Sequence, residues 1–324
     1  MKSVWLGLAF LVAVPAARRV TAQVEAPAPG QAPIERRNPE IPTITVESRL
    51  VPVALNVVDD KGVPVAGLTV DQFEVLEDGK PQKIAIFDRE SSTPLSVMLT
   101  IDSSESIFNE IRLEREAAKK FIKSILRPQD EIGLMDFADN VREIVPFTND
   151  VHRLDAGLGE LLRGEATAMY DAIYLASEQL RSRRAEGGRR RVIVMITDGD
   201  DTSHHGSYGS SLEQAQRAGA MIYALIMVPI HADAGRNTGG EHALIQMAAD
   251  TGGKFFYVEE RHDLAPAFQH ISDDLRTQYT LGYYAPQHGG DRAGLRHIEI
   301  RMKDPALRAR YTLRYRTGYY GTRP

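Results

Sequence analysis

The sequence contains no cysteine among its 324 residues. This absence excludes disulfides, thiolate metal sites, a lipid-modified cysteine and a cysteine nucleophile. A basic excess is also missing, because the formal net charge is -5, and we expect no nucleic-acid partner. The one dense basic run, Arg189-Arg190-Arg191, precedes an apolar segment and is predicted to be a solvated loop. Stability must come from the core, which a hydrophobic content of 43% permits, and from any bound cation.

The first residues have the pattern of a secretory signal. Lys2 gives a positive start, Val4 to Ala17 is apolar, and Val20-Thr-Ala22 is a small-residue cleavage site. The apolar run is too short for an ordinary transmembrane helix. We therefore predict a signal peptide over residues 1–22 and an exported protein, either periplasmic or secreted to the cell surface.

Arg18 and Arg19 lie between the apolar run and the cleavage site, so an uncleaved amphipathic anchor is the alternative. No other segment could span a bilayer, which leaves no transmembrane segment after cleavage. Residues 23–42 are rich in Pro, Ala, Gln and Glu and are predicted to be a disordered linker.

Two short segments with strand patterns flank the middle of the chain, over residues 43–92 and 278–324. In the first, Asp78-Gly79 predicts a hairpin in which Gln82–Phe87 pairs back on Phe73–Glu77. Neither segment is large enough to be stable alone. We therefore predict one β-sandwich built from both ends of the chain. Its strands are Val51–Val58, Phe73–Glu77, Gln82–Phe87, Gln278–Tyr284, Arg296–Arg301 and Tyr311–Tyr315.

Between the flanks, strands alternate with helices over residues 93–277. This alternation predicts an α/β domain with a doubly wound, mostly parallel sheet and helices on both faces. The predicted strands are Leu95–Ile101, Glu131–Phe137, Val141–Pro146, Val192–Thr197, Met221–Val228 and Lys254–Val258. The predicted helices are Ile107–Leu126, Asp150–Leu162, Ala168–Arg184, Leu212–Ala218, Glu241–Thr251 and Asp263–Arg276.

Oxygen-bearing side chains stand at the ends of two of these strands. Asp102-Ser-Ser-Glu-Ser106 follows Leu95–Ile101, and Asp198 follows Val192–Thr197. Thr167 lies in a polar turn before a helix. Ligands of open α/β sheets bind beyond the carboxyl ends of the strands, so these groups are expected to converge. Carboxylates and hydroxyls are hard donors, which suit Mg²⁺, and equally Ca²⁺ or Mn²⁺, rather than zinc or copper.

We predict that the hydroxyls of Ser104 and Ser106 bind the cation directly, and Thr167 directly or through water. Asp102 and Asp198 would act mostly through water. A cation with few direct anionic ligands stays electrophilic. It would therefore bind a carboxylate of a partner protein, an exposed Asp or Glu.

The set Asp102-x-Ser104-x-Ser106, Thr167 in Ala-Thr-Ala-Met-Tyr-Asp-Ala and Asp198 in Ile-Thr-Asp-Gly resembles the metal-ion-dependent adhesion site of von Willebrand factor type A domains. The flanks resemble exported bacterial members described as VWFA-related. The resemblance implies a short antiparallel edge strand, at Val141–Pro146 or its neighbour, and cation-dependent protein binding rather than catalysis. Glu105 stands where glycine is common in the family. It either adds charge near the cation or faces solvent.

Other interpretations remain open. Asp102 and Asp198 could simply cap helices, and His204-His205 is interpreted as part of a polar loop, since it lacks zinc spacing. An Mg²⁺-dependent hydrolase is the enzymatic rival. However, the sequence has no second Asp two residues after Asp102, no phosphate-binding loop and no nucleophile elbow, so we predict no enzyme. A third possibility is an assembly factor that binds partners through its β flanks, with a non-essential metal.

Overall fold

The computed structural model describes residues 50–88, 93–105, 111–183, 188–199, 201–203, 205–228, 238–259, 263–286 and 294–321. The predicted signal peptide and linker lie outside these residues, and so do Ser106 and His204. Within the described part, no helix is both long and apolar enough to cross a membrane.

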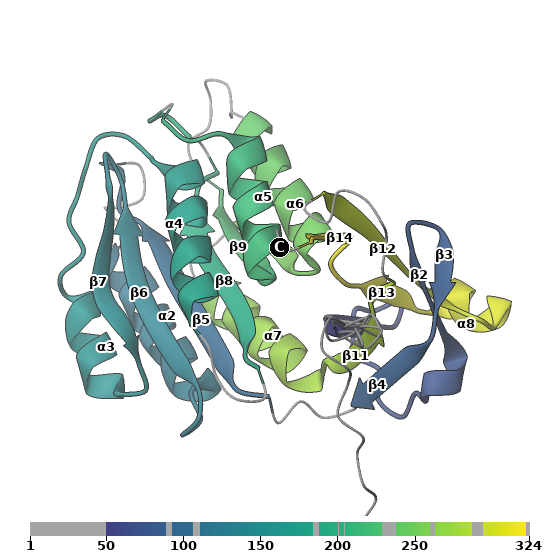
Figure 1. The fold of residues 1–324 in the computed structure, drawn as a ribbon. Helices are drawn as coiled ribbons and strands as arrows, with labels where there is room; N and C mark the ends of the chain where they lie inside the picture. Colours follow the sequence, from purple (N-terminus) through teal and green to yellow (C-terminus); the bar gives the residue numbers. More distant parts are fainter. Residues whose placement is uncertain are drawn as a thin grey trace, which may run out of the picture. The chain divides into compact units, whose positions relative to one another are not determined.

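A six-stranded sheet forms the centre of the chain, with the spatial order β10-β9-β8-β5-β6-β7 (Figure 1). All neighbours are parallel except β6 and β7, which run antiparallel at the edge. The strands are β5 (Leu95–Asp102), β6 (Glu131–Phe137), β7 (Val141–Thr148), β8 (Arg190–Thr197), β9 (Ala220–Met227) and β10 (Lys254–Val258). The predicted doubly wound sheet and its antiparallel edge strand are confirmed.

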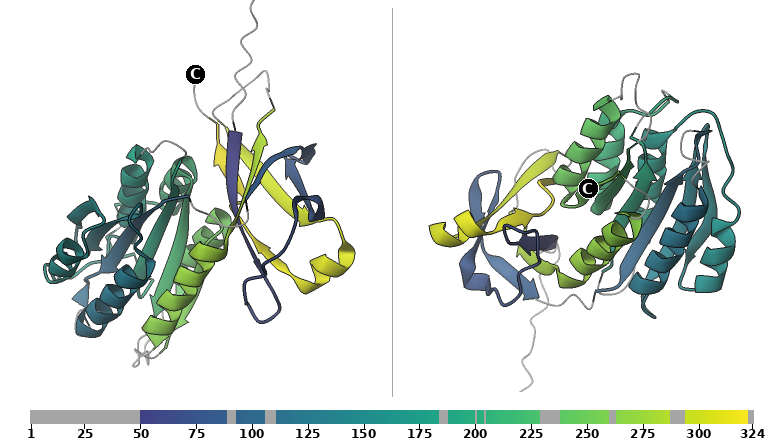
Figure 2. Two further views of the ribbon diagram at one scale, coloured as in Figure 1. Left: turned by 90° about the horizontal axis from the view of Figure 1, so that it is seen from below. Right: turned by 180° about the vertical axis from the view of Figure 1, so that it is seen from behind.

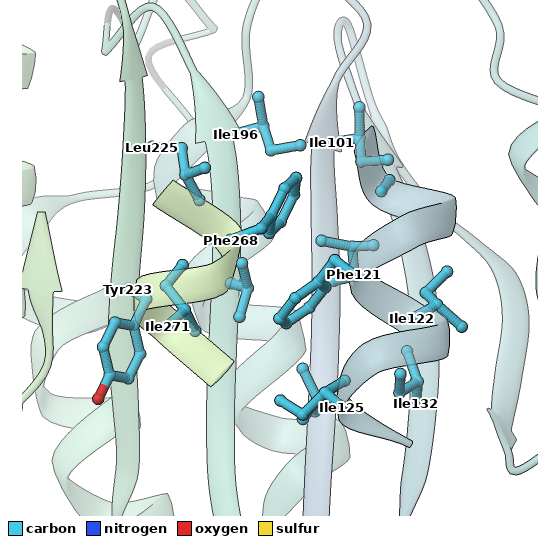
Figure 3. Close-up of a cluster of buried hydrophobic side chains, with 14 of the residues drawn as sticks. Ile101, Phe121, Ile122, Ile125, Ile132, Ile196, Tyr223, Leu225, Phe268 and Ile271 are labelled. Carbon is cyan, nitrogen blue, oxygen red and sulfur yellow. The ribbon is translucent and has the colours of Figure 1, made fainter. Parts of the chain in front are cut away.

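Helices cover both faces of this sheet, which is why its central strands are continuous apolar runs. All eight side chains of β5 are buried. One face packs against α2, α3 and α7, and the other against α4, α5 and α6 (Figures 1 and 2). The helices are α2 (Ile111–Ile125), α3 (Val151–Leu158), α4 (Met169–Ser182), α5 (Tyr208–Ala218), α6 (Thr238–Thr251) and α7 (Leu264–Thr277). In Figure 3, Phe121 of α2 stacks on Phe268 of α7, with ring centroids 4.6 Å apart.

Two antiparallel sheets flank this domain, and each joins strands from both ends of the chain. Their spatial orders are β13-β1-β11-β4 and β14-β12-β2-β3. One apolar cluster is shared by both sheets, with Val53 and Tyr279 from the first and Val75 and Ile300 from the second. The strands are β1 (Leu50–Val58), β2 (Phe73–Glu77), β3 (Lys80–Gln82), β4 (Ile84–Asp88), β11 (Tyr279–Tyr284), β12 (Leu295–Met302), β13 (Thr312–Arg314) and β14 (Gly318–Tyr320). The sandwich predicted from both chain ends is therefore present.

The predicted hairpin partner Gln82–Phe87 is wrong as a single strand. Only β3 pairs back on β2, and after Lys83 the chain crosses to the other sheet, where β4 pairs with β11. The crossing brings Phe87 onto the sandwich core, with its ring 5.4 Å from that of Tyr279. Packing between the sheets thus overrides the local hairpin signal.

Two further elements differ from the sequence prediction. The predicted loop Arg189-Arg190-Arg191 is wrong, because Arg190 begins β8 and is only 8% exposed. A short helix, α8 (Pro305–Arg310), was missed although Asp304 caps it and proline starts it, which are recognisable signals. The single turn η1 (Val70–Gln72) precedes β2.

A buried ion pair ties β12 to β2, and its loss should be measurable. Arg296 Nη1 lies 2.8 Å from Glu77 Oε1, and the Glu77 side chain is fully buried. Arg296→Met would leave that carboxylate without its cation, so we expect the free energy of unfolding in urea to fall by about 3 kcal/mol. The matched control is Arg301→Met on the same strand. Its pair with Glu299 is exposed, so this substitution should change stability far less. Equal effects of the two substitutions would contradict this assignment.

Candidate metal centre

The candidate centre is organised by the pairing of β5 with β8. Their register places Ile101 opposite Ile196, so both strands end at the same edge of the sheet. There the Thr197 hydroxyl donates to Asp102 Oδ2 at 2.7 Å. The backbone N–H of Gly199 in turn donates to Thr197 Oγ1 at 3.1 Å. The strand-end carboxylates predicted to converge are therefore held on adjacent strands.

Asp102 is fully buried, with a relative exposure of 0%. Its Oδ1 accepts the backbone N–H of Ser104 at 2.9 Å. Burial, together with the negative charge of Asp198, raises the pKa of Asp102 to about 7, against hydrogen bonds from Ser104 and Thr197. The register of β5 on β8 places the two carboxylates at neighbouring strand ends. A cation beside them would favour the ionised form of both.

The turn after β5 is held in place by the neighbouring strand and loop. Ser103 N donates to the carbonyl of Phe137 at 3.0 Å, and Gly164 N donates to the carbonyl of Ser103 at 3.2 Å. Ser104 forms an isolated bridge with Gly164 and is only 2% exposed. This pairing joins the turn that carries Ser104 to the loop that leads to Thr167.

Gly164 is required at this contact. A Cβ added there would lie 2.6 Å from the Cβ of Ala138 and 2.7 Å from Asp139 Oδ2. The same Asp139 carboxylate accepts the backbone N–H groups of Glu165 and Ala166. The loop before Thr167 is thus fixed by backbone contacts that leave no space for a side chain.

Thr167 is bonded to the segment that follows Asp198. Its backbone N–H donates to Thr202 Oγ1 at 2.8 Å, and its carbonyl accepts from Thr202 N at 3.0 Å. Asp201 Oδ1 accepts the N–H of Tyr170 in the first turn of α4 at 3.1 Å. Thr167 itself is 5% exposed. The three predicted loops therefore meet at one edge of the sheet.

Glu105 does not stand as an isolated charge in this turn. Its side chain is 62% exposed and pairs with Arg163, which is 48% exposed. The pair lies between the turn after β5 and the loop before Thr167. Arg163 offsets the extra negative charge, so of the two interpretations of Glu105 the structure agrees with the solvent-facing one.

The donor chemistry fits a hard cation. Among the described residues, no group of three or more His, Asp or Glu side chains could hold a metal. A cation here would therefore depend on the hydroxyls of Ser104 and Thr167 together with Asp102 and Asp198. A set of oxygen donors alone suits Mg²⁺, which accepts water for its remaining positions. Ser106, the fifth predicted ligand, lies outside the described residues.

Some supporting residues were missed by the sequence analysis. Thr197 and Thr202 make the bonds described above, and Glu241, at the start of α6, packs against Gly199. The Cβ that a side chain would add to Gly199 would lie 3.0 Å from Glu241 Cγ, and Gly199 has φ +87°. The role of Thr197 could have been predicted from Thr197-Asp198-Gly199, in which a hydroxyl and a glycine stand beside the acid. Nothing in the sequence connects Thr202 or Glu241 to the centre.

Residues 97–200 match the model of the von Willebrand factor type A domain. The chain is similar to the structure of BatB from Bacteroides thetaiotaomicron at 22% identity, covering 56% of this chain and 98% of that one, with a TM-score of 0.43. It is also similar to the vWF domain of the type V pili tip protein Mfa5 from Porphyromonas gingivalis at 14% identity, covering 56% of this chain and 95% of that one, with a TM-score of 0.46.

A von Willebrand factor type A protein from Catenulispora acidiphila gives 12% identity, with 83% of this chain and 72% of that chain covered and a TM-score of 0.49. No curated protein matches the chain significantly. Residues 97–200 contain Asp102, Ser104, Ser106, Thr167 and Asp198, so all five predicted ligands lie within the segment that matches the von Willebrand factor type A domain.

Proposed function

We propose that this protein is an exported binding protein that captures an acidic side chain of another protein through a divalent cation. Mg²⁺ is the favoured ion, with Ca²⁺ or Mn²⁺ as alternatives. The partner would present an exposed Asp or Glu. The proposed ligands are Asp102, Ser104, Ser106, Thr167 and Asp198.

One observation carries this proposal: few of the proposed ligands would bind the cation directly through a negative charge. Both Asp102 oxygens already accept protein hydrogen bonds, from Ser104 N and Thr197 Oγ1. Ser104 and Thr167 contribute only neutral hydroxyls. A divalent cation whose direct ligands are mostly neutral hydroxyls and water stays electrophilic, and a carboxylate from outside would bind it. Hydrolysis is less favoured, because among the described residues the centre has no general base placed beside a nucleophile.

The cation itself is the first prediction. Calorimetry should show Mg²⁺ and Mn²⁺ binding to the wild-type chain, and Asp102→Ala should weaken it at least about tenfold, because a buried carboxylate is lost. Asp60→Ala is the matched control, since Asp60 is an exposed residue of the turn after β1 and should leave the affinity unchanged.

Asp102 is buried, so the variant could also lose its fold. Circular dichroism checks this, and Asp198→Ala removes a more exposed carboxylate with the same expected loss of cation affinity. Wild-type affinity in both folded variants would refute the proposed ligand set.

Carboxylate capture is a second, separate prediction. Acetate serves as the smallest carboxylate probe and acetamide as its uncharged counterpart. In the Mn²⁺-loaded protein, the proton relaxation of acetate should be enhanced well above that of acetamide, because paramagnetic Mn²⁺ relaxes nuclei held close to it. At the same free Mn²⁺ concentration, Asp102→Ala should show only the effect of the free ion. Equal enhancement of the two probes would mean that the cation does not select a carboxylate.

A second candidate function is supported by the free edge of the β13-β1-β11-β4 sheet. Strand β4 lies at that edge, and Ile86 of β4 and Tyr284 of β11 are exposed by 41% and 54%. An extended segment of a partner could add there as a further strand. Such binding would persist in EDTA and would be weakened by Ile86→Lys. Capture from envelope extract that EDTA abolishes and Ile86→Lys does not affect would instead favour the cation.

A further inference from the structure

Arg190 carries a buried positive charge at the start of β8. It is only 8% exposed, and its Nη1 donates to Gln278 Oε1 at 2.7 Å. Its Nε and Nη2 are buried and have no acceptor in the described part of the chain. Buried N–H groups of this kind are rare, and the usual explanation is a bound water or ion. Leaving a buried N–H group unsatisfied is unfavourable, and more so when the group is charged.

The side chains next to Arg190 converge on the hydroxyl of Tyr223. Gln278 Nε2 and Asn56 Nδ2 each lie 3.4 Å from Tyr223 OH. Tyr223 and Gln278 are fully buried, and Asn56 is 3% exposed. In Figure 3 the Tyr223 hydroxyl points away from the labelled apolar side chains. This polar junction therefore joins β1 to β9 and to the residue between α7 and β11.

A second arginine with unpaired N–H groups belongs to the same junction. Arg314 on β13 is the strand partner of Asn56. Its Nη2 donates to Asp274 Oδ2 at 2.7 Å, whereas its Nε and Nη1 are buried without an acceptor in the described residues. Burial and the charge of Asp274 raise the pKa of the Tyr223 hydroxyl, and Arg314 and Arg190 lower it. The charges of both guanidinium groups thus reach the same buried oxygen, the Tyr223 hydroxyl.

Positive charge is in excess at this junction. Lys254 is the parallel strand partner of Tyr223, and its pKa is lowered by burial and then by the charge of Arg314. Two carboxylates act on these cations, and both are already paired: Asp274 with Arg314 at 2.7 Å and Asp130 with Arg276 at 2.6 Å. Burial, and then the charge of Arg276, lower the pKa of Arg190 to about 10.

We propose that the junction binds a small halide-class anion, chloride in solution, which accepts hydrogen bonds from the unpaired N–H groups of Arg190 and Arg314. A water molecule could accept some of these bonds but would leave the excess charge uncompensated in a buried setting. The anion site is built from the flanking strands β1 and β13 and from β8 and β9 of the central sheet. Its occupant therefore stabilises the contact between the sandwich and the central domain. The inference is independent of the proposed cation function.

The test measures thermal unfolding of the full chain at constant ionic strength in sodium gluconate, chloride and bromide. The midpoint of the wild-type chain should rise by at least about 3 °C from gluconate to either halide, because an anion that binds only the folded state stabilises it. Arg190→Met and Arg314→Met should each remove most of this rise. The matched control is Arg153→Met, which changes an exposed arginine of α3. This variant should show the same rise in the unfolding midpoint as the wild-type chain.

Bromide also gives a direct measurement on the wild-type chain, which does not depend on the variants folding. Crystals grown in bromide should show an anomalous peak within hydrogen-bond distance of Arg190 Nε or Nη2. An ordered water without anomalous signal at that position would overturn the proposal. So would a wild-type midpoint that does not respond to halide, or a response that survives in both arginine variants.

Discussion

The hydrogen bond from Thr197 to Asp102 joins the ends of β5 and β8, and the candidate centre depends on it. Parallel pairing places the residues that follow the two strands at one edge of the sheet. Burial then does two things to Asp102. It fixes the carboxylate in one orientation, and it makes the ionised form costly unless a positive charge is near. The turn with Ser104 and the loop with Thr167 are bonded around this carboxylate, so their positions follow from the same strand pairing.

Strand β8 has a buried negative group beside one end and a buried positive group at the other. Its last residue, Thr197, contacts the buried carboxylate of Asp102, while its first residue, Arg190, is a buried cation with unpaired donors. The apolar run Val192–Ile196 separates them. The proposed cation at one end and the proposed anion at the other would therefore act on separate charges, and neither ion could substitute for the other.

The sequence predicted correctly those features that depend on the residue pattern within a single strand. The bounds of β2 and β10 were predicted correctly from alternation and apolar runs alone. The convergence of Asp102 and Asp198 required only that their strands be neighbours. Residues whose partners are distant in sequence could not be predicted in this way. A run of three arginines is usually solvated, and the buried partner of Arg190, Gln278, lies 88 residues further along the chain. Whether the candidate residues bind a metal remains a prediction.

The β-sandwich can be built from both chain ends because the ends of the central domain lie side by side. The chain leaves the sandwich at Asp88 of β4 and returns at β11, where Thr280 is the strand partner of Asp88. An insertion with adjacent ends leaves the host sheet uninterrupted. Helix α7 leads almost directly into β11, and Asp274 of α7 is held by Arg314 of β13. The strand that leads into the central domain, β4, is thus paired with β11, the strand that leads out of it.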